Sequence, residues 1–420
     1  MIATTTLDRR ALLASLAALA LPLSSRAATA SAYPALKAFL DGYIDAKKLP
    51  GAVLAIRRGE EAVQYMSAGT LAFDAALPAT PDSLFRIYSM TKPITGIAAM
   101  KLVEDGKLKL DQPVGEIVDG FKSPQVIVDP TAMTTRPATK PMLIRHLLTH
   151  TSGLSYNILR GPLAALYVKN GIRPGDRSTD TAPGDLPTAR DLETFGKRLA
   201  ALPLDFEPGS RWQYSVAMDL MGLIIQRVSG QSFYDYLRTH IFEPLRMGDT
   251  DFVVPKSKVE RLTSVVTVKD GHVVVTEDRK ASPFTRDRDL PSGGGGLVST
   301  ARDYSRFTAM LLNEGTLDGA RIVKAETARL ARSNLMDPGV KFYGGNGFGA
   351  AVSVILPGGE RPGQEPAGSF SWFGIAGTQM WVDPVNKLSV VLMLQEYPTT
   401  YPVQSEVRVA AYKDMAALKG

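Results

Sequence analysis

The chain has 420 residues, enough for two domains, and 45% of them are apolar, so a large buried core is expected. It contains no cysteine, which excludes thiol nucleophiles, disulfides, iron–sulfur clusters and cysteine-based zinc sites. The formal charge is +6, of which residues 1–30 carry +2, and the remaining +4 is spread without the basic runs that bind nucleic acid.

Residues 1–30 have the order of features of an export signal peptide. Arg9 and Arg10 precede an apolar run over 11–23, and small residues follow at 28–30. The paired arginines favour the twin-arginine route and hence a periplasmic location. A membrane anchor is the alternative, but the run is too short to cross ~30 Å of hydrocarbon as a helix. No later segment is apolar for long enough, so we expect no stable membrane insertion after cleavage near Ala30.

The first part of the mature chain predicts a helix and then a hairpin. Residues 34–49 have helical spacing, and residues 51–69 are typical of two strands joined by a turn at Arg58-Gly59. A second helix is predicted over 89–105. It is apolar nearly all round, as expected of a buried helix.

The middle of the chain is rich in loops. Residues 110–250 alternate helical pieces with segments rich in Pro, Gly and Asp, such as 173–187, which favours an inserted, mostly helical domain. Strands return after 252, with hairpins predicted over 265–276 and 377–395. A last helix is expected to start at Ser405, as its N-cap, and to run to about residue 418.

These elements predict an α/β fold of the α+β type. Hairpins near both ends of the chain favour an antiparallel sheet flanked by the N- and C-terminal helices. We expect residues 34–85 and 252–420 to form this sheet domain and residues 86–251 to form the helical domain. The active site would then lie in the cleft between them.

The motif S-M-T-K at 89–92 places Ser89 and Lys92 three residues apart at a helix start. Unpaired N–H groups and the helix dipole favour an anion there, and Lys92 lies on the same helix face. Desolvation in a buried apolar helix would let the lysine act as a base. Alternatively, Ser89 is an ordinary helix N-cap and Lys92 is solvated. A catalytic role for the pair therefore requires further residues of the site.

Two later segments supply candidate partners. Tyr214 follows a Pro-Gly turn and precedes a predicted helix, so its hydroxyl would project into a cleft. The alternative is that Tyr214 and Trp212 are core aromatics. Trp372, Phe373 and Gly374 stand at the start of a predicted strand, where the glycine would let a backbone N–H approach a substrate.

Five segments in this order resemble the serine hydrolases related to class C β-lactamases and penicillin-recognising enzymes. The similarity is greatest to the β-lactamase-like carboxylesterases of family VIII, and it runs from about residue 34 to 400. The segments are SMTK (89–92), LIRHLLTHTSGLSY (143–156), WQYS (212–215), HIFEPLRMGDT (240–250) and PSGGGGLVST (291–300).

The resemblance implies a role for each matching residue. Ser89 would be the acylated nucleophile and Lys92 its proton acceptor. Tyr214 would share the base role and then protonate the leaving group. Trp372 to Gly374 would replace the K-T-G of β-lactamases and the W-G-G of these esterases as substrate-binding residues. The N–H groups of Ser89 and Ile375 would form the oxyanion hole.

The sequence departs from the family pattern at two positions. Val216 stands where β-lactamases have the Asn of Y-x-N, a change shared by the esterase branch. Phe373 replaces the usual Gly or Thr, which affects the shape of the pocket.

Other constellations are less favoured. The G-x-S-x-G of α/β-hydrolases is missing. His146 and His150 have a zinc-like spacing, but the glutamate of H-E-x-x-H and a third ligand are missing, so no metal is expected and the segment is interpreted as a turn behind the nucleophile helix. Residues 345–350 match G-x-G-x-x-A but precede a strand, and the glycines at 293–296 lack the Lys-Ser/Thr of a phosphate loop, which favours tight packing beside the cleft.

The sequence therefore predicts an exported serine hydrolase that forms an acyl-enzyme and hydrolyses short-chain carboxylic esters without a cofactor. A β-lactamase, a D-alanyl-D-alanine peptidase or an acyltransferase with the same residues is the alternative. A catalytically silent penicillin-binding relative is disfavoured, because Ser89, Lys92 and Tyr214 are all present. The expected partner is a small ester substrate and not a nucleic acid.

Overall fold

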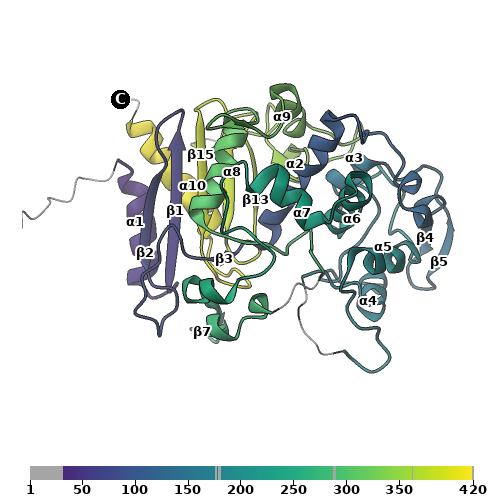
Figure 1. Cartoon of the computed structure of the whole chain (residues 1–420), viewed down its shortest axis with the longest axis horizontal. Coiled ribbons are helices and arrows are strands. Elements are labelled where there is room, and N and C mark those ends of the chain that lie inside the picture. Colours follow the sequence, from purple (N-terminus) through teal and green to yellow (C-terminus); the bar gives the residue numbers. More distant parts are fainter. Residues whose placement is uncertain (1–31, 176, 178–180, 287–289, 362, 419–420) are drawn as a thin grey trace, which may run out of the picture.

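A seven-stranded antiparallel sheet occupies the left half of the molecule in Figure 1, and the mostly helical part of the chain lies to its right. The computed structural model describes residues 32–175, 177, 181–286, 290–361 and 363–418, so the predicted export signal lies outside the described residues. The strand order β11-β12-β13-β14-β15-β1-β2 places the first hairpin beside the last strand. The strands are β1 (Gly51–Arg58), β2 (Gln64–Gly69), β11 (Gly347–Phe348), β12 (Ser353–Val354), β13 (Phe370–Phe373), β14 (Gln379–Asp383) and β15 (Leu388–Met393).

Alternation along β1 directs its side chains into two apolar cores. Val53 belongs to the larger core, whereas its neighbour Leu54 belongs to the smaller one. Helices α1 (Pro34–Asp45) and α10 (Val403–Ala417) cover the smaller core, and α8 (Ala301–Leu312) packs on the other face of the sheet. Burial on both faces explains why β1 is apolar without interruption from Gly51 to Ile56, before the two partly exposed arginines that end it.

Asp414 joins the two terminal helices. Its carboxylate accepts hydrogen bonds from the N–H groups of Ala35 (2.8 Å) and Leu36 (2.9 Å) in the first turn of α1, where N–H groups have no partner within the helix. Tyr43 of α1 also donates a hydrogen bond to Glu406 of α10 (2.8 Å). The two ends of the described chain therefore lie side by side, as the sequence predicted.

Most elements between β2 and β6 are helices. Two of them are deeply buried: α2, in which every residue from Thr91 to Met100 is buried, and α6, in which every residue from Ala217 to Ile225 is buried. A single 3₁₀ turn, Tyr88–Met90, leads into α2. The helices are α2 (Thr91–Glu104), α3 (Ile144–Leu148), α4 (Pro162–Lys169), α5 (Leu192–Ala200), α6 (Ala217–Ser229) and α7 (Phe233–Leu237).

Short hairpins and one further helix complete the described chain. The pair β3–β8 joins the segment before the nucleophile turn to the segment after the 293–296 glycines. The elements are β3 (Phe85–Arg86), β4 (Gln125–Asp129), β5 (Thr134–Pro137), β6 (Val265–Lys269), β7 (His272–Glu277), β8 (Val298–Ser299), β9 (Thr316–Leu317), β10 (Ala320–Arg321) and α9 (Ala325–Ala331).

The predicted fold class is confirmed, including the antiparallel sheet, both later hairpins and the flanking terminal helices. The predicted start of the last helix was wrong. Helix α10 begins at Val403 after Pro402, and the hydroxyl of Ser405 donates a hydrogen bond to the Pro402 carbonyl (3.0 Å) inside the first turn. A proline can open the helix because it has no N–H group to satisfy.

The division into a sheet domain (34–85 and 252–420) and a helical domain (86–251) stays a prediction. The larger apolar core contains side chains of both segments, for example Val53 and Met218. The two segments therefore share one core, and α2 runs through it.

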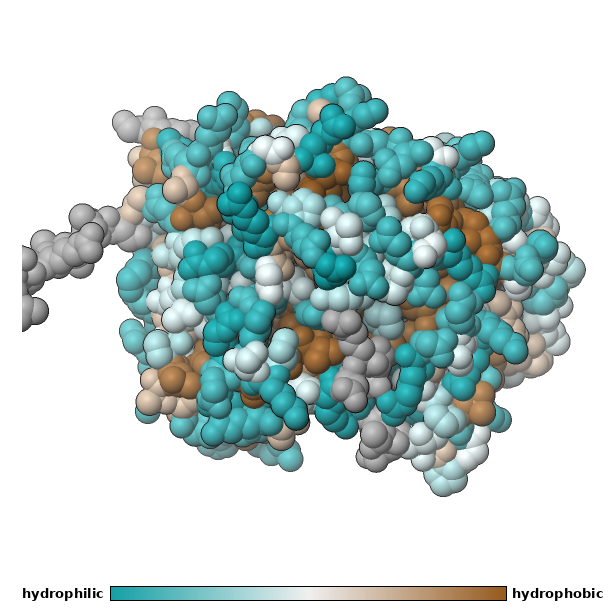
Figure 2. All heavy atoms as spheres, viewed as in Figure 1, coloured by the Kyte–Doolittle hydropathy of each residue, from teal (hydrophilic) through white to brown (hydrophobic). Residues whose placement is uncertain are grey.

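The face drawn in Figure 2 is mostly hydrophilic, with apolar side chains in small islands between charged ones. Some exposed large apolar side chains, such as Val128 and Val385, come from separate parts of the chain, as is ordinary for a protein surface. Others line one cavity: Ile158, Tyr343, Phe373, Ile375 and Tyr397. Among the described residues, no helix has both the length and the apolar composition that crossing a membrane requires.

Replacing Asp414 with alanine is expected to lower the free energy of unfolding by about 1–3 kcal/mol, because two N–H groups at the start of α1 lose their acceptor. Denaturant titration followed by circular dichroism measures the change. Asp41→Ala is the matched control, since Asp41 of the same helix pairs with Lys37 at the surface and should contribute less than about 0.5 kcal/mol. Equal losses of unfolding free energy in the two variants would contradict a stabilising contact of Asp414 between α1 and α10.

Candidate active site

Ser89 lies in the 3₁₀ turn that leads into α2. Tyr88 before it has a left-handed backbone (φ 42°), which is uncommon for a bulky residue and persists where packing holds it. The Tyr88 ring stacks on Tyr397 (centroids 5.9 Å apart) and meets Phe284 edge-on (6.4 Å). With this backbone Ser89 lines a cavity at the start of α2, while the rest of the helix is buried.

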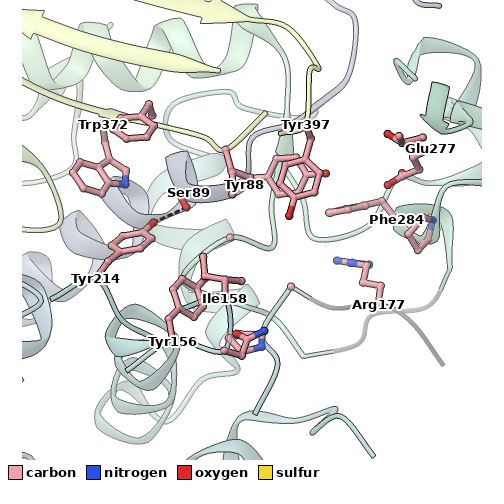
Figure 3. A pocket seen from close by; sticks show the side chains of 18 of the residues that line it. Tyr88, Ser89, Tyr156, Ile158, Arg177, Tyr214, Glu277, Phe284, Trp372 and Tyr397 are labelled. Atoms are coloured by element: carbon pink, nitrogen blue, oxygen red, sulfur yellow. Dashed lines mark hydrogen bonds between the residues drawn. The ribbon is translucent and has the colours of Figure 1, made fainter. Parts of the chain in front are cut away.

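Two residues selected from the sequence, Lys92 and Tyr214, meet at the Ser89 hydroxyl. Lys92 Nζ donates a hydrogen bond to Ser89 Oγ at 3.1 Å. Tyr214 Oη donates another at 2.6 Å, drawn as the dashed line in Figure 3. Helix α2 supplies Lys92, and the loop before α6 supplies Tyr214. One oxygen atom therefore has two proton-exchanging groups within reach.

The Lys92 amino group lies beneath the cavity, and the residue has no exposure to solvent. Besides Ser89, its Nζ donates to the carbonyl of Gly294 at 2.5 Å. It lies 4.5 Å from the ring centroid of Tyr214 and 5.6 Å from that of Tyr156. A buried amino group needs such polar and aromatic neighbours in place of water, and these contacts fix Nζ beside Ser89.

The glycines at 293–296 pack against the helices behind the site. A Cβ atom on Gly293 would lie 2.4 Å from the carbonyl oxygen of Met218, and one on Gly294 would lie 2.5 Å from a carboxylate oxygen of Asp219. The Gly294 N–H donates a hydrogen bond to Asp219 at 3.0 Å. Tight backbone packing beside the cleft, expected from the sequence, is confirmed.

A cavity of about 820 Å³ opens above Ser89. Figure 3 shows Trp372 and Tyr214 near Ser89, with Phe284 and Arg177 at the opposite end. Most of the wall is apolar or aromatic. Its aromatic members are Tyr88, Tyr156, Trp212, Tyr214, Phe284, Phe342, Tyr343, Trp372, Phe373 and Tyr397.

Two tyrosines of this wall stay protonated near neutral pH. Burial raises the pKa of Tyr88 to about 12. Burial, followed by the charges of Asp219 and Tyr214, raises the pKa of Tyr156 well above its usual value of 10. Both are hydrogen-bond donors at neutral pH and not candidates for the base.

Trp372 and Phe373 close strand β13, so the prediction that they start a strand was wrong. The chain turns directly after them into the β13–β14 hairpin. Trp372 is 6% exposed and packs against Tyr214 (5.8 Å) and Phe348 (5.2 Å), whereas Phe373 is 45% exposed at the rim. Val216 is fully buried at the start of α6 and is absent from the cavity wall.

Gly374 and Ile375 follow in the hairpin turn. The Gly374 N–H donates a hydrogen bond to the Thr378 carbonyl at 2.7 Å, and a Cβ atom on Gly374 would lie 2.6 Å from the carbonyl oxygen of Ile87. Gly374 therefore lies behind the cavity wall, where its lack of a side chain lets the hairpin turn approach the backbone of Ile87. Ile375 lines the cavity together with Ser89.

The two histidines of the zinc-like spacing have different partners. His146 Nε2 lies 3.2 Å from a carboxylate oxygen of Asp337, and His150 Nδ1 lies 3.0 Å from Ser215 Oγ. Burial holds the pKa of His150 well below its usual 6.5, so its ring, packed 4.9 Å from that of Tyr214, is neutral. Across the described ranges no three His, Cys, Asp or Glu side chains gather in a metal-binding arrangement.

Many residues of the cavity wall were not predicted from the sequence. Tyr88 and Tyr156 were detectable in principle, because one adjoins Ser89 and the other ends the segment 143–156. Phe284 and Tyr397 stand in segments without a motif, and long-range packing brings them to the cavity.

Comparison with known proteins identifies the family. The model of the Beta-lactamase family matches residues 36–412, so the chain belongs to this family. An uncharacterized protein of Mycobacterium tuberculosis is 34% identical, covering 89% of this chain and 92% of that protein. Esterase EstB of Burkholderia gladioli is 32% identical, covering 90% and 93%. The solved structure of EstCE1, described as a hydrolase with promiscuous acyltransferase activity, superposes with a TM-score of 0.74 at 25% identity, covering 91% and 98%.

Gly374→Ala is expected to lower kcat/KM at least ~10-fold, because the new Cβ would meet the Ile87 carbonyl and the turn that carries Ile375 must shift. Steady-state hydrolysis of an ester measures the loss, with thermal unfolding to confirm the fold. Gly248→Ala is the matched control, since a Cβ atom there has nothing within 4 Å. Wild-type kcat/KM in folded Gly374→Ala would contradict a role for the turn.

Proposed function

We propose that this member of the Beta-lactamase family is a serine carboxylesterase that works through an acyl-enzyme on Ser89. The observation that carries the proposal is the pair of hydrogen bonds from Lys92 and Tyr214 to one serine oxygen at the floor of an aromatic cavity. Esterase EstB, which is similar over most of its length, supports esters as the substrate class.

In the first half-reaction, Ser89 Oγ bonds to the ester carbonyl carbon and its proton passes to the Lys92–Tyr214 pair. When the tetrahedral intermediate collapses, the bond from carbon to the alcohol oxygen breaks. The pair then returns the proton to the departing alkoxide, leaving the acyl group on Ser89. Water repeats the sequence, which releases the carboxylic acid and restores the serine hydroxyl.

The oxyanion of the intermediate would be bound by the N–H groups of Ser89 and Ile375. Both residues line the cavity. Two N–H donors beside the nucleophile would stabilise the negative charge that develops on the carbonyl oxygen.

The aromatic wall favours neutral esters. Trp372 and Phe373 stand where relatives with K-T-G place a lysine and a threonine. A carboxylate beside the scissile carbonyl, as in penicillins and D-alanyl peptides, would be desolvated against these rings at a cost of several kcal/mol. Apolar acyl or alcohol groups gain roughly 25 cal/mol per Å² of buried surface instead. The volume of about 820 Å³ also admits groups larger than a short acyl chain.

Transfer of the acyl group to an alcohol is the second candidate. EstCE1 is described as a hydrolase with acyltransferase activity, and the cavity volume leaves room for an alcohol beside a bound acyl group. Product analysis with added alcohol separates transfer from hydrolysis.

We further propose that residues 1–30 direct export by a twin-arginine-type signal to the periplasm. The order of paired arginines, apolar run and small residues supports this location. Fractionation of cells that express the full chain tests it.

Ser89→Ala is expected to lower ester hydrolysis ~10³-fold or more, because no neighbouring group can take the place of the nucleophile. Turnover of p-nitrophenyl butyrate and intact mass after reaction with a fluorophosphonate measure the effect. A variant that retains wild-type turnover, or an adduct on another residue, would refute the assignment of Ser89.

Tyr214→Phe is expected to keep the ring packing and to lower kcat roughly 10²-fold or more, because only the hydroxyl that contacts Ser89 Oγ is lost. Tyr234→Phe is the matched control, since its hydroxyl donates to Asp251 outside the cavity. Full activity in Tyr214→Phe would make Tyr214 a packing residue.

Neutral short-chain esters are expected to have kcat/KM at least ~10²-fold above that of penicillins, which corresponds to about 2.7 kcal/mol. One preparation assayed in parallel with p-nitrophenyl acetate or butyrate, a penicillin and a D-Ala-D-Ala peptide measures the ratio. A higher value for the penicillin or the peptide would favour the β-lactamase or peptidase alternative.

A further inference from the structure

Asp219 is a buried carboxylate two residues inside α6, and the mechanism above does not use it. It has no exposure to solvent. Its Oδ1 accepts hydrogen bonds from the Ser292 hydroxyl and from the Gly294 N–H (3.0 Å). Among the described residues its Oδ2 is buried without a hydrogen-bond partner. A carboxylate in such a place costs free energy, so a compensating charge should be close.

Gly294 links Asp219 to Lys92 through its two backbone groups. The N–H of Gly294 points to Asp219, and its carbonyl oxygen accepts the hydrogen bond from Lys92 Nζ at 2.5 Å. Because glycine leaves φ and ψ unrestricted, the two hydrogen bonds together hold the two peptide planes of Gly294. The approach is close, since a Cβ atom on Gly294 would be 2.5 Å from Asp219 Oδ2.

We infer that Asp219 is a positioning residue, which holds Gly294 in place for Lys92 and supplies the negative charge that balances the Lys92 ammonium beside Ser89. This inference rests on the proposed function, because it assigns Lys92 and Tyr214 as the proton-exchanging pair. Asp219 is absent from the cavity wall, so it acts on the chemistry through Gly294 and Lys92 and not through the substrate.

The groups that face this centre come from several segments. Lys92 comes from α2, Tyr156 and His150 from the segment around α3, Tyr214 from the loop before α6, and Asp219 from α6 itself. Burial raises the pKa of Asp219, while the charge of Lys92 acts in the opposite direction. His150 is neutral and Tyr156 is protonated. Asp219 and Lys92 therefore lie on opposite sides of Gly294, with a hydrogen bond from each side to that residue.

The expected effect on catalysis follows from where the proton goes. Ser89 gives up its proton to the Lys92–Tyr214 pair, so this pair gains positive charge in the transition state. A fixed negative charge close to the pair stabilises that state. Removal of the charge should therefore lower kcat and leave KM nearly unchanged.

Asp219→Asn and Asp219→Ser test the inference in the full chain, because both variants remove the charge and keep an oxygen that can accept a hydrogen bond. We expect kcat for p-nitrophenyl butyrate to fall at least ~10-fold and KM to stay within about two-fold. Asp303→Asn is the matched control. Asp303 is also buried, yet it accepts hydrogen bonds from Asp249 and Thr250 away from the cavity.

The outcomes separate the two proposals. Folded Asp219 variants that react with a fluorophosphonate at Ser89 and keep the wild-type kcat overturn this inference and leave the esterase proposal intact. Failure of the wild-type enzyme to label at Ser89 would overturn the proposed function itself. Collapse of both Asp219 variants while Asp303→Asn folds would make Asp219 a structural residue and also overturn the inference. A loss of kcat of similar size in Asp303→Asn would show a general effect of buried charge and would overturn it as well.

Discussion

The rest of the active site depends on the burial of the Lys92 amino group. An ammonium without access to water is costly unless polar groups replace its hydration. The Gly294 carbonyl and the Ser89 hydroxyl are two such groups. The ring of Tyr214 is a third neighbour of the amino group. The Gly294 carbonyl lies close enough to Lys92 because Gly293 and Gly294 pack their backbone directly against Met218 and Asp219.

Helix α2 connects this requirement to the whole fold. A Cβ atom on Gly96 would lie 2.4 Å from the Ala350 carbonyl oxygen, so the helix and the loop after β11 are in direct backbone contact. The same helix lies in the core shared by sheet and helical segments, and its first turn presents Ser89. Since interiors are close-packed, a change in the seating of α2 changes the position of the nucleophile.

Local patterns made much of the fold predictable, and distant contacts made the rest unpredictable. Hairpins and buried helices appear as alternation and apolar runs, and the resemblance selected Ser89, Lys92 and Tyr214, which do meet. The role of each remains a proposal. The left-handed backbone of Tyr88 depends on rings supplied from elsewhere in the chain, which no local pattern encodes. The burial of Val216 likewise depends on the packing of α6 and not on its own motif.

The pairing of β1 with β15 sets the order in which the protein can be completed during synthesis. Val53 of β1 can pair only after Met393 of β15 has been synthesised. The N–H of Ala35 likewise gains its acceptor only when Asp414, 379 positions later, has been added. At ribosomal rates of about 5–20 residues per second, the inner edge of the first hairpin stays unpaired for roughly 20–70 s. An unpaired strand edge can form hydrogen bonds with strands of other chains. A nascent chain of this protein therefore needs protection, by a chaperone or by transient local contacts, until its last strand emerges.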